Sequence, residues 1–84
     1  MEKLGSDLHT AMNKVWMCSH RDGSSFSLPH AGKEMASLIK RLDSLGYVEE
    51  IFEVPGREPG VNGKITSKGR EYYQEYFGNP PIRL

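Results

Sequence analysis

The sequence has one cysteine, no long apolar run and no excess of charge of either sign. Cys18 lacks a second cysteine for an internal disulfide, which is typical of a chain kept in a reducing compartment. The apolar runs are far shorter than the roughly 20 residues that span a bilayer. Residues 1–5 also lack the apolar stretch of a secretory signal. We therefore expect a soluble, intracellular (cytoplasmic) protein with no membrane segment.

Charge gives no direct support for a nucleic-acid partner. Eleven Lys and Arg residues balance eleven Asp and Glu residues, so the net charge at pH 7 is zero. A nucleic-acid-binding domain usually has a positive net charge or at least a basic face. Any nucleic-acid binding by this chain must therefore depend on where its cations are placed.

Motifs for catalysis and metal binding are also missing. The sequence has no nucleophile motif, phosphate-binding loop or recognisable pair of carboxylates. Cys18, His9, His20 and His30 do not have the spacing of a four-ligand zinc site. We expect no enzymatic activity, no catalytic residues, no metal and no cofactor.

What the sequence does contain is an ordered series of amphipathic segments in 84 residues, a length that suits one domain, residues 1–84. Apolar spacing predicts helices over residues 7–20, 31–45 and 67–77. A short element at residues 25–30 is undecided between a strand and a helical turn. Residues 47–66 are β-prone at both ends and predict a hairpin with a long Gly- and Pro-rich tip. The fold class is α+β and mainly α.

Several residues mark the ends and the packed faces of these helices. We expect Ser6 to cap the first helix, Gly46 to end the second and Thr66 to cap the third. Gly69 lies at the centre of an aromatic stripe, where its missing side chain permits close packing. The residues expected to face the core from the second helix are Met35, Leu38, Ile39, Leu42 and Leu45.

Two joins between these elements resemble winged helix-turn-helix regulators. Residues 38–50 (LIKRLDSLGYVEE) are similar to the junction of a recognition helix with its wing. Residues 63–73 (GKITSKGREYY) resemble the strand-to-helix segment that follows the wing in MarR-like and PadR-like families. The resemblance implies a winged helix-turn-helix domain with three to four helices and a two-stranded β-hairpin wing. Those families usually have a full helix before the recognition helix. Only residues 25–32 are available here, so the helix-turn-helix would be abbreviated.

The resemblance implies a regulator that binds duplex DNA in a sequence-specific way, controlling transcription or a mobile element, with any small-molecule effector left open. The second helix has a polar face opposite its apolar stripe, and Lys, Ser and Arg side chains can contact phosphates and base edges in a major groove. The residues expected to contact DNA are His30, Lys33, Ser37, Lys40, Arg41 and Ser44 around this helix, with Arg57 at the wing tip and Lys64 near the base of the hairpin. Glu49, Glu50 and Glu53 lie on the wing strand and need not approach the DNA.

The last helix has an aromatic stripe of Tyr72, Tyr73, Tyr76 and Phe77. We expect most of it to pack inside the domain. Because so small a domain cannot easily bury four large rings, part of the stripe is expected to form a homodimer contact.

Two other functions remain open. Zero net charge and exposed aromatics would also suit a protein-interaction module with the same fold and no DNA binding. Residues 26–30 (FSLPH) and 46–54 (GYVEEIFEV) resemble the N-terminal half of the eighth small-subunit ribosomal protein, which implies binding of ribosomal RNA. That ribosomal resemblance requires a strand at residues 67–77, whereas the winged-helix resemblance requires a helix.

Overall fold

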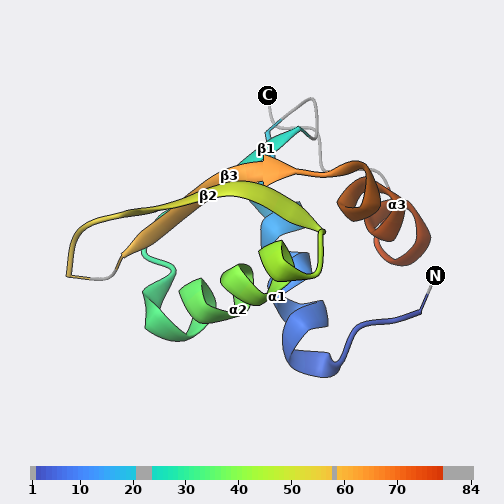
Figure 1. Ribbon diagram of the computed structural model, residues 1–84, viewed down its shortest axis with the longest axis horizontal. Coiled ribbons are helices and arrows are strands. Elements are labelled where there is room, and N and C mark those ends of the chain that lie inside the picture. Colours follow the sequence, from blue (N-terminus) through green and yellow to red (C-terminus); the bar gives the residue numbers. More distant parts are fainter. Residues whose placement is uncertain (1, 21–23, 58, 79–84) are drawn as a thin grey trace.

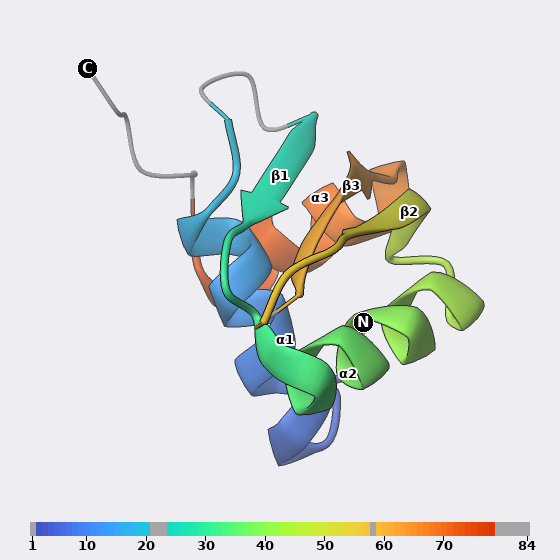
Figure 2. The same cartoon turned by 90° about the vertical axis from the view of Figure 1, so that its left-hand side faces the viewer.

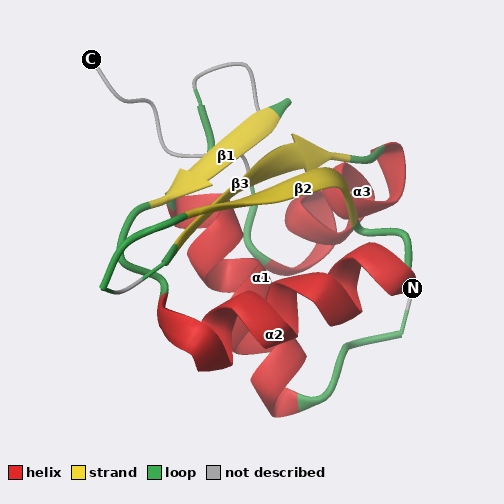
Figure 3. Cartoon of the chain, turned by 60° about the vertical axis from the view of Figure 1, so that its left-hand side comes forward, coloured by secondary structure: helices red, strands yellow, loops and turns green. Residues whose placement is uncertain are grey.

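The computed structural model describes residues 2–20, 24–57 and 59–78 of the chain. The elements are α1 (Ser6–Met17), β1 (Ser25–Leu28), α2 (Gly32–Ser44), β2 (Val48–Val54), β3 (Gly60–Ile65) and α3 (Ser67–Tyr76). The three strands form one antiparallel sheet in the order β1-β3-β2. Helices α1 and α2 lie against one face of this sheet, and α3 lies beyond one end of it (Figure 1, Figure 3). The chain is therefore an α+β domain.

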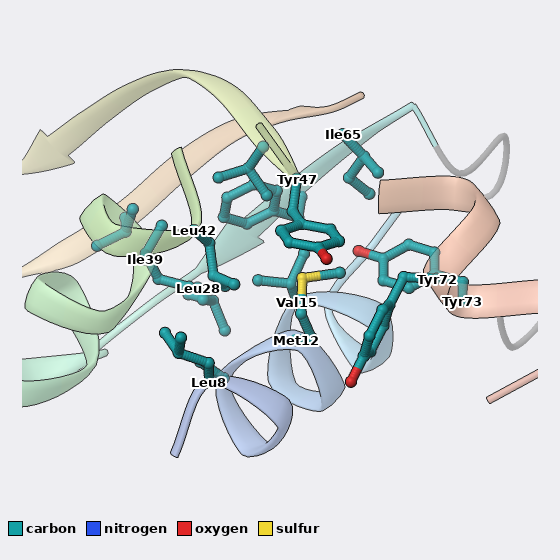
Figure 4. Close-up of a cluster of buried hydrophobic side chains, with 14 of the residues drawn as sticks. Leu8, Met12, Val15, Leu28, Ile39, Leu42, Tyr47, Ile65, Tyr72 and Tyr73 are labelled. Atoms are coloured by element: carbon teal, nitrogen blue, oxygen red, sulfur yellow. The ribbon is translucent and has the colours of Figure 1, made fainter. Parts of the chain in front are cut away.

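The core lies between the sheet and the helices (Figure 4). Apolar residues at helical spacing in α1 and at alternate positions in the strands face this space, as amphipathic elements require. The main buried side chains are Leu8, Met12 and Val15 of α1, Phe26 and Leu28 of β1, Ile39 and Leu42 of α2, Val48, Val61 and Ile65 of the other strands, and Tyr72 and Tyr73 of α3.

The three predicted helices are confirmed, with small differences at their ends. Helix α1 ends three residues earlier than predicted, because the chain turns there and runs beside β1. The His20 amide donates to the carbonyl of Ser25 at 2.8 Å, and the Ser27 amide donates to the carbonyl of Cys18 at 3.2 Å. The predicted Ser6 cap is wrong: Gly5 occupies the N-cap position, and no side chain caps this helix.

Residues 25–28 form a strand, which decides the element left open by the sequence. β1 pairs with β3, so the sheet has three strands where a two-stranded hairpin was predicted. The residues described between α1 and α2 contain this strand and no helix. A helix-turn-helix is therefore not formed by that part of the chain. The short Ser-Phe-Ser-Leu alternation explains the strand, because Phe26 and Leu28 both point into the core.

Helix α2 buries a narrower stripe than predicted. Ala36, Ile39 and Leu42 are its buried residues, while Met35 and Leu38 are half-buried against the core. Leu45 is 43% exposed, contrary to the prediction, because it follows the last helical residue. Gly46 then adopts a φ of +87° and turns the chain toward β2, which confirms its predicted role in ending the helix.

Hydrogen bonds of Thr66 connect the start of α3 to the turn that follows α2. The Thr66 hydroxyl accepts a hydrogen bond from the Gly69 amide at 3.1 Å and donates to the Gly46 carbonyl at 2.5 Å. A Cβ on Gly69 would overlap with the carbonyl oxygen of Tyr47, so only glycine permits this approach. The predicted cap and the predicted close packing are both confirmed. Because residues 67–76 are helical, the strand that the ribosomal resemblance requires is not formed there.

Candidate nucleic-acid interface

The polar face of α2 is exposed over its whole length. Its members lie opposite the buried stripe of Ala36, Ile39 and Leu42, and the 3.6-residue period of the helix turns them away from the core. The exposed residues of the predicted set on this helix are Lys33, Ser37, Lys40, Arg41 and Ser44. His30, in the turn before the helix, is also exposed and has a left-handed φ of +57°.

The N-terminal end of α2 lies beside the outer end of the β2–β3 hairpin (Figure 1). The Gly32 amide donates to the carbonyl of Pro59 at 3.2 Å and fixes this approach. His30 and Arg57 line one hollow of about 620 Å³ at this end. Lys33 lines a neighbouring hollow of about 270 Å³ together with Ser37, Lys40, Glu53 and Pro59. The structure thus places five of the predicted residues at this end of the domain in two separate hollows, with His30 and Arg57 in one and Lys33, Ser37 and Lys40 in the other.

Glutamates of β2 pair with two of the predicted cations. Lys40 Nζ lies 2.9 Å from Glu53 Oε1, and Lys64 Nζ lies 2.8 Å from Glu50 Oε2. The hydrogen bond to Glu50, together with its charge, raises the pKa of Lys64. Glu53 lies beside the polar face of α2, where it neutralises one of the predicted DNA-contacting cations. Glu53 is the cross-strand partner of the buried Val61. Cross-strand partners point to the same side of a sheet, so the Glu53 side chain lies on the face that α2 covers.

The other predicted residues do not join this end of the molecule. Lys64 is registered with Ser25 and Glu49, at the end of β3 that leads into α3. The Ser44 hydroxyl lies in the last turn of α2, where it donates to the carbonyl of Lys40 at 3.3 Å. Arg41 lines a different hollow between α2 and α1, which also contains Asp7 and Glu34. The predicted site is therefore divided.

Sequence reasoning missed the outer face of the sheet. No described helix covers this face (Figure 2). A hollow of about 460 Å³ on it is lined by Ser25, Ser27, Phe52, Asn62 and Lys64 among others. The signal was the alternation of polar and apolar residues in 25–28 and 60–65, which becomes informative only once both segments are known to be strands.

The aromatic stripe of α3 is largely internal. Tyr72 and Tyr73 are only 0% and 1% exposed within a single chain, so their assignment to a homodimer contact is wrong. Burial raises the pKa of Tyr73. Tyr76 and Phe77 are half-buried, and the Phe77 ring lies 4.9 Å from that of His9 and 5.6 Å from that of Trp16. The homodimer stays a prediction, and only these last two rings reach the surface.

Among residues 2–20, 24–57 and 59–78, no three His, Cys, Asp or Glu side chains gather into a group that could hold a metal ion. None of the helices in these segments is both long and apolar enough to cross a membrane. Comparisons with protein families, with curated proteins and with solved structures give no significant match to this chain.

Proposed function

We propose that this protein is a small DNA-binding regulator that contacts duplex DNA with the N-terminal half of α2 and the outer end of the β2–β3 hairpin. The order of helix, strand, helix, hairpin and helix is compatible with a winged-helix-like layout. In this proposal β1 stands where such a domain would have the first helix of its helix-turn-helix. The observation that carries the proposal is the hydrogen bond from Gly32 to Pro59, which holds the start of α2, with His30 and Lys33, beside the hairpin end that carries Arg57.

The shape of this end suits a duplex. A helix with its side chains is about 10–12 Å across, and the major groove is about 12 Å wide. The N-terminal end of a helix is also the positive end of its dipole, which favours phosphate nearby. With this end of α2 in the groove, the hairpin end beside it would meet the sugar–phosphate backbone.

Each residue at this end has a distinct role in the proposal. Lys33 and Arg57 form no ion pair with any other described residue and would contact phosphates directly. Lys40 would exchange Glu53 for a phosphate, which is feasible because an exposed ion pair is worth only about 0–1 kcal/mol. Ser37 and His30 would face base edges, where hydroxyl and imidazole groups can donate or accept hydrogen bonds.

Fluorescence anisotropy with a labelled duplex of random sequence at low salt tests the proposal. We expect weak association of the wild type, because non-specific binding comes from phosphate contacts. The double variant Lys33→Ala/Arg57→Ala should weaken this association and flatten its salt dependence by about two units of slope. Lys64→Ala is the matched control, because it removes one cation from the opposite end of β3.

Equal affinities of the double variant and the wild type would show that the proposed surface is wrong. An absence of any duplex binding by the folded protein at low salt would favour a protein-interaction module instead. Circular dichroism of each variant checks that the fold is retained. All three substituted side chains are exposed, so the substitutions should leave the core unchanged.

A further inference from the structure

The outer face of the sheet combines an exposed ring with oriented polar groups. Phe52 is 58% exposed, a large value for a phenylalanine, and it is registered with Asn62 across the β2–β3 pair. Asn62 is in turn registered with Ser27 across the β1–β3 pair. Cross-strand partners point to the same side of a sheet, so these three side chains form a row across all three strands.

The polar pair in this row is held in one orientation. The Ser27 hydroxyl donates to Asn62 Oδ1 at 2.7 Å, which assigns the amide oxygen of Asn62 to this bond. The two N–H donors of the amide and the lone pairs of the serine oxygen then stay available to a ligand. An oriented amide beside an exposed ring can hydrogen-bond the edge of a planar group that stacks on the ring.

Two hollows meet at this row. One extends toward Phe52 and Lys64, and the other extends toward His30 and Arg57; both include Ser27 and Asn62. Together they form a trough along the outer face with a cation near each end. Two glutamates also lie near the Lys64 end: Glu50 pairs with Lys64, and Glu49 is registered with it.

The size of the face limits what can occupy it. Three strands spaced about 4.8 Å apart make a surface only about 10–14 Å wide. A stable protein–protein interface needs about 800 Å² on each partner, which a sheet of three short strands does not supply alone. A single extended chain with planar groups along it fits better. Nucleic acid meets this description, and its bases stack on aromatic rings with little dependence on sequence.

We propose that the outer face of the sheet binds single-stranded nucleic acid, with one base stacked on Phe52 and hydrogen-bonded by Asn62. The phosphates on either side of that base run toward Arg57 at one end and Lys64 at the other. Helix α2 lies against the other face of the sheet (Figure 2, Figure 3), so Phe52 and Asn62 are separate from its polar face; His30 and Arg57 border both surfaces.

Labelled ten-nucleotide oligomers of deoxythymidine and of uridine, titrated at low salt and followed by anisotropy, test this inference. A base–aromatic stack is worth about 1–3 kcal/mol, so Phe52→Ala should weaken binding at least about five-fold. Phe52→Trp keeps a stacking ring and should keep the wild-type affinity. Leu45→Ala is the matched control, because Leu45 is an exposed apolar side chain at the end of α2, away from this face.

The inference is overturned if neither oligomer binds the folded wild type at low salt, or if Phe52→Ala binds them as tightly as the wild type does. The same series with the duplex probe separates this inference from the proposed function. Lys33→Ala should weaken duplex binding alone, and Phe52→Ala should weaken single-strand binding alone. Either surface can therefore fail while the other stands.

Discussion

At the scale of single residues, one hydroxyl group ties the N-terminal segment and α1 to α3. Tyr72 Oη accepts a hydrogen bond from the Leu4 amide at 3.0 Å and lies 2.6 Å from His9 Nδ1. A tyrosine hydroxyl can donate its one proton to an unprotonated ring nitrogen, which is the arrangement that a neutral His9 with its own proton on Nε2 would give.

The lowered pKa of His9 makes stability depend on pH. Burial, and secondarily the charge of Lys3, lower the pKa of His9 below its ordinary value of 6.5, so the unfolded chain takes up this proton more readily than the folded one. The contribution of neutral His9 is complete above pH 6.5 and is lost as the pH falls through its folded pKa. We expect a lower Tm at pH 5 than at pH 7.5 in thermal melts.

His9→Gln tests the assignment, because glutamine can accept the Tyr72 hydrogen bond without titrating. Its melts should show a smaller difference in Tm between these two pH values than the wild type shows. His30→Gln is the control, since that exposed side chain is remote from Tyr72. An unchanged pH dependence in His9→Gln would contradict the role given to this imidazole.

Gly69 provides a second test at this scale. Alanine has the better helix propensity by about 1 kcal/mol, so an open position would gain stability from the substitution. At Gly69 the new methyl group would overlap with the Tyr47 carbonyl, and overpacking costs about 1–3 kcal/mol. We expect Gly69→Ala to lower the free energy of unfolding measured with urea. Arg70→Ala, at the next and exposed position, should leave it within about 0.5 kcal/mol. If Gly69→Ala were as stable as the wild type, the backbone of α3 at residue 69 could move away from the Tyr47 carbonyl without loss of stability.

At the scale of elements, the join of α2, β2 and α3 depends on Thr66. Its hydroxyl serves both the first turn of α3 and the chain reversal after α2. Loss of a threonine cap costs about 0.5–2 kcal/mol. We expect Thr66→Ala to destabilise the protein by at least that amount in urea denaturation, whereas Thr66→Ser should retain most of the stability. If the alanine variant matched the serine variant, the hydroxyl bonds would contribute nothing.

The sequence predicted the elements best where local signals agreed. Helix α3, its Thr66 cap and the turn at Gly46 depend on neighbouring residues, so each was predicted correctly. The strand at 25–28 has only four residues, and its alternation gains meaning only from β3, which lies more than thirty residues away in the sequence. The outer face was missed for the same reason: the residues that form a row across the strands can be identified only once the pairing register is known.

The residues of the predicted interface are brought together only in part, for a related reason. Helical periodicity correctly placed Lys33 and Lys40 on an exposed face. It could not show that Glu53 meets Lys40, because that contact depends on a bulge between Glu49 and Phe52 that sets which later β2 residues face the helix. Lys64 was predicted near the base of the hairpin and Arg57 at its tip, and the structure has the two near opposite ends of the hairpin.

At the scale of the whole molecule, zero net charge reflects acidic residues placed beside the cations. Glu34 lies in the first turn of α2 and Glu53 lines the same hollow as Lys33, while Glu49 and Glu50 lie toward the other end of the sheet with Lys64. A neutral domain with such an arrangement would have weak long-range attraction for DNA. Its affinity would come from a few close contacts, which are sensitive to salt.

The salt dependence of duplex binding is the most direct test of this account. Three phosphate contacts, from Lys33, Lys40 and Arg57, should give a slope of about −2.7 in a plot of the logarithm of the binding constant against the logarithm of the salt concentration. The Lys33→Ala/Arg57→Ala variant should reduce that slope to about −0.9. A wild-type slope near zero, or a slope that the double variant leaves unchanged, would contradict the account.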